Sequence, residues 1–71
     1  MADSVYRVTE LIGTSSESWE AAARNAISTA SASLRDLRIA TVTNSDLVLE
    51  YGQVASYRVR LEVSFKFESN A

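Results

Sequence analysis

The sequence predicts an α+β fold in the order β-α-β-β, in which a three-stranded antiparallel sheet carries one helix on one face. Three observations lead to this fold class. Residues 57–68 ("YRVRLEVSFKFE") alternate apolar and polar side chains without interruption, which is typical of a strand with one apolar and one charged face. Residues 19–34 carry apolar side chains at helical spacing. The segments 5–12 and 37–51 have the composition and alternation of strands.

The first strand is expected over residues 5–12, which are rich in β-branched side chains, and Gly13 is expected to end it. A helix start follows in "GTSSESWE". Thr14 and Glu17 have the spacing of a capping box, and Ser15 or the serine after it is an alternative N-cap.

The expected helix has one apolar face, on which Trp19 is expected to be a core residue. Most of the other side chains on this face are small, so the helix can lie close to a sheet. The residues of the face are Trp19, Ala23, Ala26, Ile27, Ala30 and Leu34.

Residues 37–51 are expected to form one long second strand with a bulge or bend near Ser45. The same alternation places every second residue on one face both before and after that point. Gly52 marks a hairpin turn before the third strand. Twelve residues of strand span about 40 Å, whereas a helix of about 18 residues spans about 27 Å. The uncovered apolar strand ends, with Phe65 and Phe67, therefore require another chain.

Composition limits the class of protein. The chain of 71 residues is expected to be a single domain, 1–71, and its 46% of hydrophobic residues is typical of a globular protein. Cysteine and histidine are both absent, which excludes disulfides, argues against a zinc site and removes the usual nucleophile and general base of enzymes. A core of this size rarely contributes more than about 3–5 kcal/mol, so oligomerisation or a hard cation is expected to add stability.

Charge and hydropathy indicate the compartment and the partners. The net charge of −2 gives no reason to expect nucleic acid or an acidic membrane as a partner. No apolar run approaches the ~20 residues of a membrane span. The N-terminus lacks the basic region and apolar run of a signal peptide. We therefore expect a cytoplasmic protein.

Acidic and amide side chains near the second strand are candidate ligands for a hard cation such as calcium. Asn44, Asp46 and Glu50, together with Glu10, offer the oxygen atoms that such a cation prefers. Their spacing lacks the glycine of a calcium-binding loop, so solvated turn residues are the favoured interpretation.

Two arginines on the charged face of the third strand, Arg58 and Arg60, have the chemistry to hold a phosphate or a carboxylate. A solvated sheet face, or cross-strand pairing with Glu62 and Glu68, would explain them without any ligand, and this is the favoured interpretation.

The segments "YRVTELIGTSSESWEAAARNAI" and "YRVRLEVSFKFE" resemble the dodecins, and the resemblance covers nearly the whole chain. It implies a three-stranded antiparallel sheet wrapped around one helix, and a hollow homododecamer with the helices outside and the sheets lining the interior. The charged face of the third strand would then face the cavity and the subunit contacts.

Flavin binding is the activity that the resemblance implies first. Family members stack flavin rings between tryptophans at a two-fold contact, and a glutamine on the facing strand bonds the ring. In this chain the tryptophan position falls on Ile39 and the glutamine position on Arg58. Isoleucine has no aromatic face, and arginine has donors only. A typical flavin site is therefore not expected.

A subgroup of dodecins described as calcium dodecins also lacks the stacking tryptophan and carries "TSWE"-like and "LEVSFK"-like segments, so this chain resembles it more. Asp46, Glu50 and Glu10 are then the candidate ligands of a divalent cation. The expected function is a non-enzymatic storage or binding protein for a small ligand or ion, assembled as a homododecamer. The alternatives are a flavin-binding dodecin with a weakened site at Ile39, and a structural assembly without a specific ligand.

Overall fold

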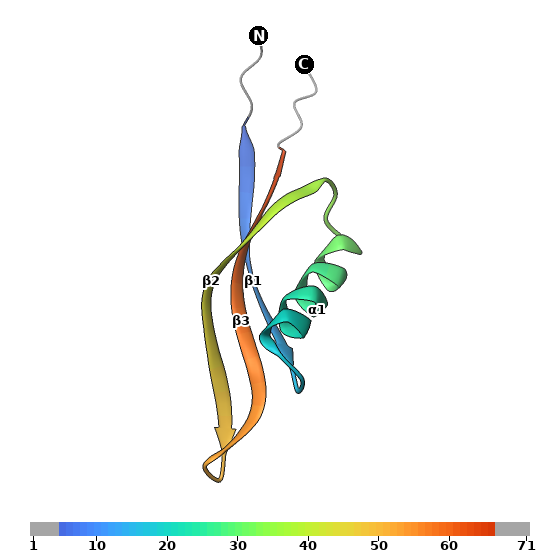
Figure 1. Ribbon diagram of the computed structural model, residues 1–71. Coiled ribbons are helices and arrows are strands. Elements are labelled where there is room, and N and C mark those ends of the chain that lie inside the picture. Colours follow the sequence, from blue (N-terminus) through green and yellow to red (C-terminus); the bar gives the residue numbers. More distant parts are fainter. Residues whose placement is uncertain (1–4, 67–71) are drawn as a thin grey trace.

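The computed structural model describes residues 5–66 of the chain. Its elements are β1 (Tyr6–Ser15), α1 (Trp19–Ser31), β2 (Leu37–Glu50) and β3 (Gln53–Lys66), which confirms the predicted order β-α-β-β. The sheet order is β1-β3-β2, with β3 antiparallel to both neighbours (Figure 1). The predicted strand residues Phe67 and Glu68 lie outside the described residues.

The core lies between the middle strand and the helix. Val59, Leu61 and Val63 of β3 are at most 2% exposed, which confirms the apolar face predicted from their alternation. Because β3 is the central strand, its alternate side chains have strands on both sides and α1 above them. The helix contributes the buried side chains of Ala22, Ala26 and Ala30.

The N-terminus of α1 differs from the prediction. Ser18 is the N-cap, and its side chain accepts a hydrogen bond from the backbone N–H of Ala21 at 3.0 Å. The predicted capping box at Thr14 and Glu17 is wrong. Ser15 Oγ instead accepts from the N–H of Glu17 at 3.0 Å, which stabilises the turn before the helix. The helix has 13 residues, and no helix in the described part of the chain is long and apolar enough to cross a membrane.

Gly13 does not end the first strand, as the sequence had suggested, but lies inside β1 and opposite Val59. A Cβ atom at this position would collide with the carbonyl oxygen of Ala22 and lie 2.8 Å from the Cβ of Ala26. The absence of a side chain at Gly13 therefore allows the strand and α1 to approach closely. This approach centres the buried face of the helix on Ala22 rather than on the predicted Trp19 and Ala23, and Trp19 is 39% exposed.

β2 is one long strand, as predicted, but its faces change along its length. Register shifts lie between Leu37 and Ile39, between Val42 and Asn44, and between Val48 and Leu49. The predicted bulge near Ser45 therefore lies at Thr43, whose Oγ1 donates to the carbonyl oxygen of Arg60 at 3.2 Å.

The prediction that every second residue of β2 lies on the same face of the sheet is wrong, because the bulges shift the alternation. Val42 lies opposite Leu61 and Leu47 opposite Tyr57, so both share the helix side of the sheet with the buried residues of β3. Ile39 lies opposite Ser64, on the other face.

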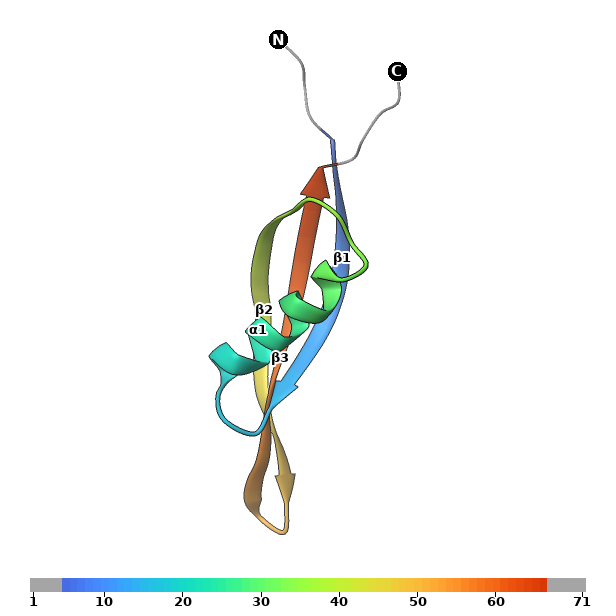
Figure 2. The ribbon, with the colours of Figure 1, turned by 90° about the vertical axis from the view of Figure 1, so that its right-hand side faces the viewer.

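The β2–β3 hairpin, residues 47–56, is called the hairpin arm below. Its turn has φ of 52° at Tyr51 and 76° at Gly52, as in a type I′ turn, which confirms the predicted hairpin at Gly52. Figures 1 and 2 show the hairpin arm extending well past the end of α1. The molecule is accordingly elongated, with extents of 55 × 21 × 13 Å.

Candidate functional site

The face of the sheet opposite α1 is covered by no other element of the described chain and is called the open face (Figure 1). Strand register brings the charged residues of β3 together there with side chains of both neighbouring strands. The open face carries Tyr6, Val8, Glu10, Ile12 and Thr14 from β1, Ile39, Thr41, Asn44 and Asp46 from β2, and Arg58, Arg60, Glu62 and Ser64 from β3.

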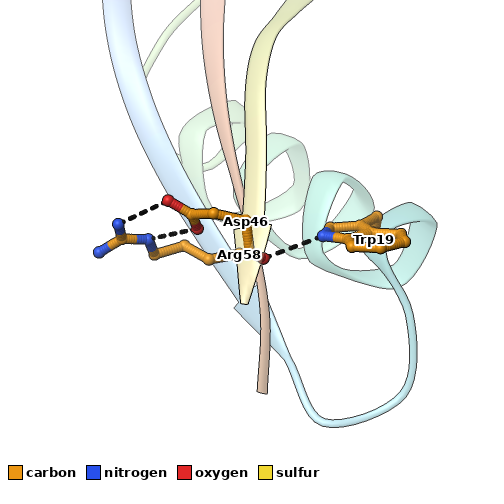
Figure 3. Close-up of polar contacts among 3 residues, drawn as sticks. All are labelled: Trp19, Asp46 and Arg58. Carbon is orange, nitrogen blue, oxygen red and sulfur yellow. Dashed lines mark hydrogen bonds and ion pairs between the residues drawn. The ribbon is translucent and has the colours of Figure 1, made fainter. Parts of the chain in front are cut away.

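Arg58 and Asp46 form a bidentate ion pair on the open face (Figure 3). Arg58 Nε donates to Oδ1 of Asp46 at 2.8 Å, and Nη2 donates to Oδ2 at 2.7 Å. The hydrogen bonds from Arg58 hold the pKa of the Asp46 carboxyl below its ordinary value; partial burial opposes this, and the charges of Arg58 and Arg60 add to it. The pKa of Arg58 is raised by the same bonds. Nε and Nη2 of Arg58 are therefore both engaged in hydrogen bonds within the chain.

Asp46 is also held from the other side of the sheet. Its backbone carbonyl accepts a hydrogen bond of 3.0 Å from Nε1 of Trp19, as Figure 3 shows. The Trp19 ring also packs edge-on against Tyr57, with 5.2 Å between the ring centroids and an interplanar angle of 80°. Within one chain Trp19 therefore joins the start of α1 to the sheet from a half-exposed position, and the prediction that it is a core residue is wrong for the single chain.

Arg60 pairs with Glu10 of β1, with 3.5 Å between Nη1 and Oε1. The prediction that both arginines pair across strands is confirmed, but the predicted acids are wrong. Asp46 is the direct neighbour of Arg58, and Glu10 is diagonal to Arg60. The register of β3 against β1 and β2 therefore determines which acid pairs with each arginine.

Glu62, which was not among the predicted cation ligands, lies directly opposite Glu10 on the open face. Like charges at directly opposed positions of two strands destabilise the sheet, and a bound cation would relieve the repulsion. Thr41 lies opposite Glu62 on the other neighbouring strand. Only the register between β1 and β3 identifies this pair, so the sequence by itself carries no signal for it.

The three predicted cation ligands do not come together within one chain. Glu10 and Asp46 lie on β1 and β2, on opposite sides of β3, and two strand spacings separate such residues by at least about 10 Å. Glu50 is at the end of the hairpin arm. Among residues 5–66, no three acidic side chains are close enough together to hold a metal ion.

The two positions that match the flavin site share the open face but are also separate. Ile39 is 59% exposed and lies opposite Ser64, whereas Arg58 lies opposite Asp46. Ser64 and Arg58 are six residues apart on β3, which corresponds to about 20 Å at 3.3 Å per residue. A ligand that touches both positions would therefore need two chains.

Comparison with known proteins decides the family: the dodecin family model matches residues 5–68. The chain belongs to the dodecin family. This dodecin is 46% identical over 63 residues to the calcium dodecin of Mycobacterium tuberculosis, and the match covers 89% of each chain. The predicted resemblance, including that to the calcium dodecin type, is confirmed.

Solved dodecin structures share the fold. The dodecin from Streptomyces coelicolor is 41% identical, with a TM-score of 0.90 over 99% of this chain and 100% of that one. The dodecin from Streptomyces davaonensis is 35% identical, with a TM-score of 0.88 over 96% and 100%. The crystal structure of the Mycobacterium tuberculosis calcium dodecin, described as calcium chelating and as having a novel calcium-binding site, is 42% identical, with a TM-score of 0.81 over 94% and 96%.

Proposed function

We propose that this dodecin is a non-enzymatic, cytoplasmic binding or storage protein that assembles as a hollow homododecamer and binds a divalent cation, with calcium as the first candidate. The observation that carries the proposal is the open face, where Glu10 and Glu62 oppose each other across β1 and β3. The identity of 46% with a calcium dodecin over 89% of both chains supports the choice of cation.

The distribution of apolar surface supports assembly. Among residues 5–66 the buried apolar side chains are few, and three of them are alanines. Large apolar side chains stay exposed on the open face, among them Val8 at 58%, Ile12 at 52% and Ile39 at 59%. Burial of each large apolar side chain contributes about 1.5–3 kcal/mol, so covering these residues with further copies offers the stability that one chain lacks. The number of twelve subunits follows from the family resemblance.

The proposed cation ligands are oxygen atoms of the open face and of the hairpin arm. Calcium takes about 6–8 oxygen ligands, and two carboxylates supply at most about four. Glu10 and Glu62 would therefore need water or carboxylates of neighbouring copies to complete the coordination. Glu50 at the end of the hairpin arm is a candidate contributed by a neighbour. Asp46 is a weaker one because Arg58 already bonds both of its carboxylate oxygens, whereas Arg60 approaches only Oε1 of Glu10, at 3.5 Å.

Flavin binding is expected to be weak. A ring over Ile39 would lose aromatic stacking worth about 0.5–1.5 kcal/mol per pair on both sides of a two-fold contact, and Arg58 has no acceptor to offer. We expect flavin affinity at least about 100-fold, or 2.7 kcal/mol, below that of a dodecin with both determinants. Ile39→Trp combined with Arg58→Gln should recover much of this loss.

The proposal is tested on protein treated with a chelator and then titrated with calcium by calorimetry, while light scattering gives the assembled mass. Glu10→Gln and Glu62→Gln should each weaken calcium binding by about tenfold or more, as the loss of a charged ligand predicts. Glu20→Gln, an exposed acid in the first turn of α1, is the control and should leave binding unchanged. Absence of calcium binding at millimolar concentration would contradict the cation, and a stable monomer at micromolar concentration would contradict the assembly.

A further inference from the structure

A groove with an apolar lining runs along the seam between α1 and β2 and is called the seam groove. It encloses about 470 Å³ and is lined by Ala23, Arg24, Ile27, Ser28, Ala40, Val42 and Leu61. A smaller hollow of about 240 Å³ extends it toward Trp19. The groove exists because α1 lies chiefly over β1, where Gly13 admits it, and stands away from β2. Val42 on its floor is 52% exposed.

The hairpin arm carries apolar side chains that its own chain does not cover. Leu49 is 59% exposed, Val54 is 48% exposed and Tyr51 is fully exposed. Figures 1 and 2 show that the end of the arm lies beyond α1 and points away from the helix. The arm therefore cannot reach the seam groove of its own chain.

The backbone at the end of the arm gives a second, independent indication. Tyr51 has a φ of 52°, in the left-handed region that bulky side chains rarely adopt. Asparagine or aspartate before the glycine would fit this type I′ turn without that cost. A tyrosine at this position implies that its side chain is used there, because backbone strain persists where function maintains it.

The charges beside these two surfaces are complementary. Arg24 lies at the groove and forms no ion pair with another residue of the described range 5–66. Glu50 directly precedes Tyr51 on the arm and likewise has no cationic partner within those residues. One surface thus offers an apolar side chain beside an acid, and the other an apolar groove beside a base.

We propose that the hairpin arm of one copy places Tyr51 in the seam groove of a neighbouring copy, with Glu50 meeting Arg24 at the edge of the groove. The inference rests on the proposed assembly and specifies which surfaces of two copies meet. Glu50 is then engaged by Arg24, so the proposed cation keeps Glu10 and Glu62 as ligands and takes its remaining oxygen atoms from water or other carboxylates.

Disulfide trapping tests the contact directly, because the chain contains no cysteine of its own. Tyr51→Cys combined with Ser28→Cys places one thiol on the arm and one at the groove. Mild oxidation should link most of this variant into multimers on a non-reducing gel. Tyr51→Cys combined with Ser16→Cys, an exposed serine outside the groove, is the control and should not form multimers. Equal linkage of both variants, or no linkage of the first in an intact assembly, would overturn the proposal.

Charge reversal tests the same contact without cysteines. Arg24→Glu and Glu50→Arg should each raise the concentration at which the assembly dissociates by about tenfold, and the double variant should restore it. Arg35→Glu, at an exposed position outside the groove, is the control. A double variant as weak as the single ones would refute the contact. If the unmodified chain is a monomer, the proposed assembly itself fails, whereas an intact dodecamer that fails both tests overturns only this inference.

Discussion

Replacing Gly13 by alanine is expected to destabilise the protein more than its single added methyl group suggests. The new Cβ would collide with the carbonyl oxygen of Ala22 and come within 2.8 Å of the Cβ of Ala26. Both neighbours belong to the backbone or lie directly on it, so no side-chain rotation relieves the contact. The helix must retreat from β1, and this opens the core over Val59.

The magnitude follows from the rigidity of the site. Adding a methylene to a packed core costs about 1–3 kcal/mol when side chains can adjust, and here the adjustment must come from a helix, so we expect about 3 kcal/mol or more. For a domain of this size that corresponds to a fall of about 12 °C or more in Tm. Denaturant and thermal melts at one fixed protomer concentration measure the effect, since assembly makes both depend on concentration.

Gly52→Ala is the matched control for this substitution. Gly52 has a φ of 76°, but nothing lies within 4 Å of the added Cβ, so only backbone strain of about 1–2 kcal/mol is expected. Ala26→Gly added to Gly13→Ala should rescue little, because the carbonyl of Ala22 remains in place. A Gly13→Ala protein within about 1 kcal/mol of the unmodified one would show that the close approach of β1 and α1 is wrong.

Three further substitutions or titrations examine individual contacts. Trp19→Phe keeps a ring near Tyr57 but removes the N–H bonded to the carbonyl of Asp46. The free energy of unfolding should therefore fall by about 0.5–1.5 kcal/mol in a denaturant melt. An unchanged melt would show that the hydrogen bond is not made. The pKa of the Asp46 carboxyl, measured by carbon NMR, should lie below its ordinary value because Arg58 bonds the ionised form. Because the pKa is lower in the folded state, the ion pair stabilises the fold at neutral pH, and this contribution is lost as the pH falls through that pKa. Asp46→Asn should therefore flatten this part of the acid-unfolding curve. An unaltered curve would show that the ion pair does not contribute to stability. Leu61→Ala, at a side chain only 2% exposed, should cost about 2–5 kcal/mol, and a smaller loss would mean that the site collapses around the gap.

The features that the sequence predicted well are those decided by local periodicity. The division of the β3 side chains between an apolar and a charged face follows from their strict alternation, because every second side chain of a strand points the same way. The hairpin at Gly52 follows from the need for positive φ in its turn. The pairing of Arg58 and Arg60 across strands follows from the same logic, since a charged sheet face favours opposite charges on neighbouring strands.

The features that failed depend on contacts between elements. Gly13 has the same appearance in the sequence whether it ends a strand or admits a helix, and only the packing of α1 distinguishes the two. The helix start was predicted too early because several serines precede Trp19, and each has the chemistry of a cap. The bulge at Thr43 reverses the faces of β2 through its pairing with β3, and the opposition of Glu10 and Glu62 follows from register in the same way.

The position of the lone tryptophan has an optical consequence. Trp19 is the only tryptophan of the chain, and it lies beside the seam between α1 and β2 rather than at the position of Ile39. Its emission therefore reports the polarity of that seam, and the arrival of an apolar side chain from another copy should move the emission maximum to shorter wavelength. Quenching of this emission by added flavin would not by itself demonstrate a stacked complex. The fluorescence of the flavin must be followed instead, and the indole is then left as an intrinsic probe of how the chains come together.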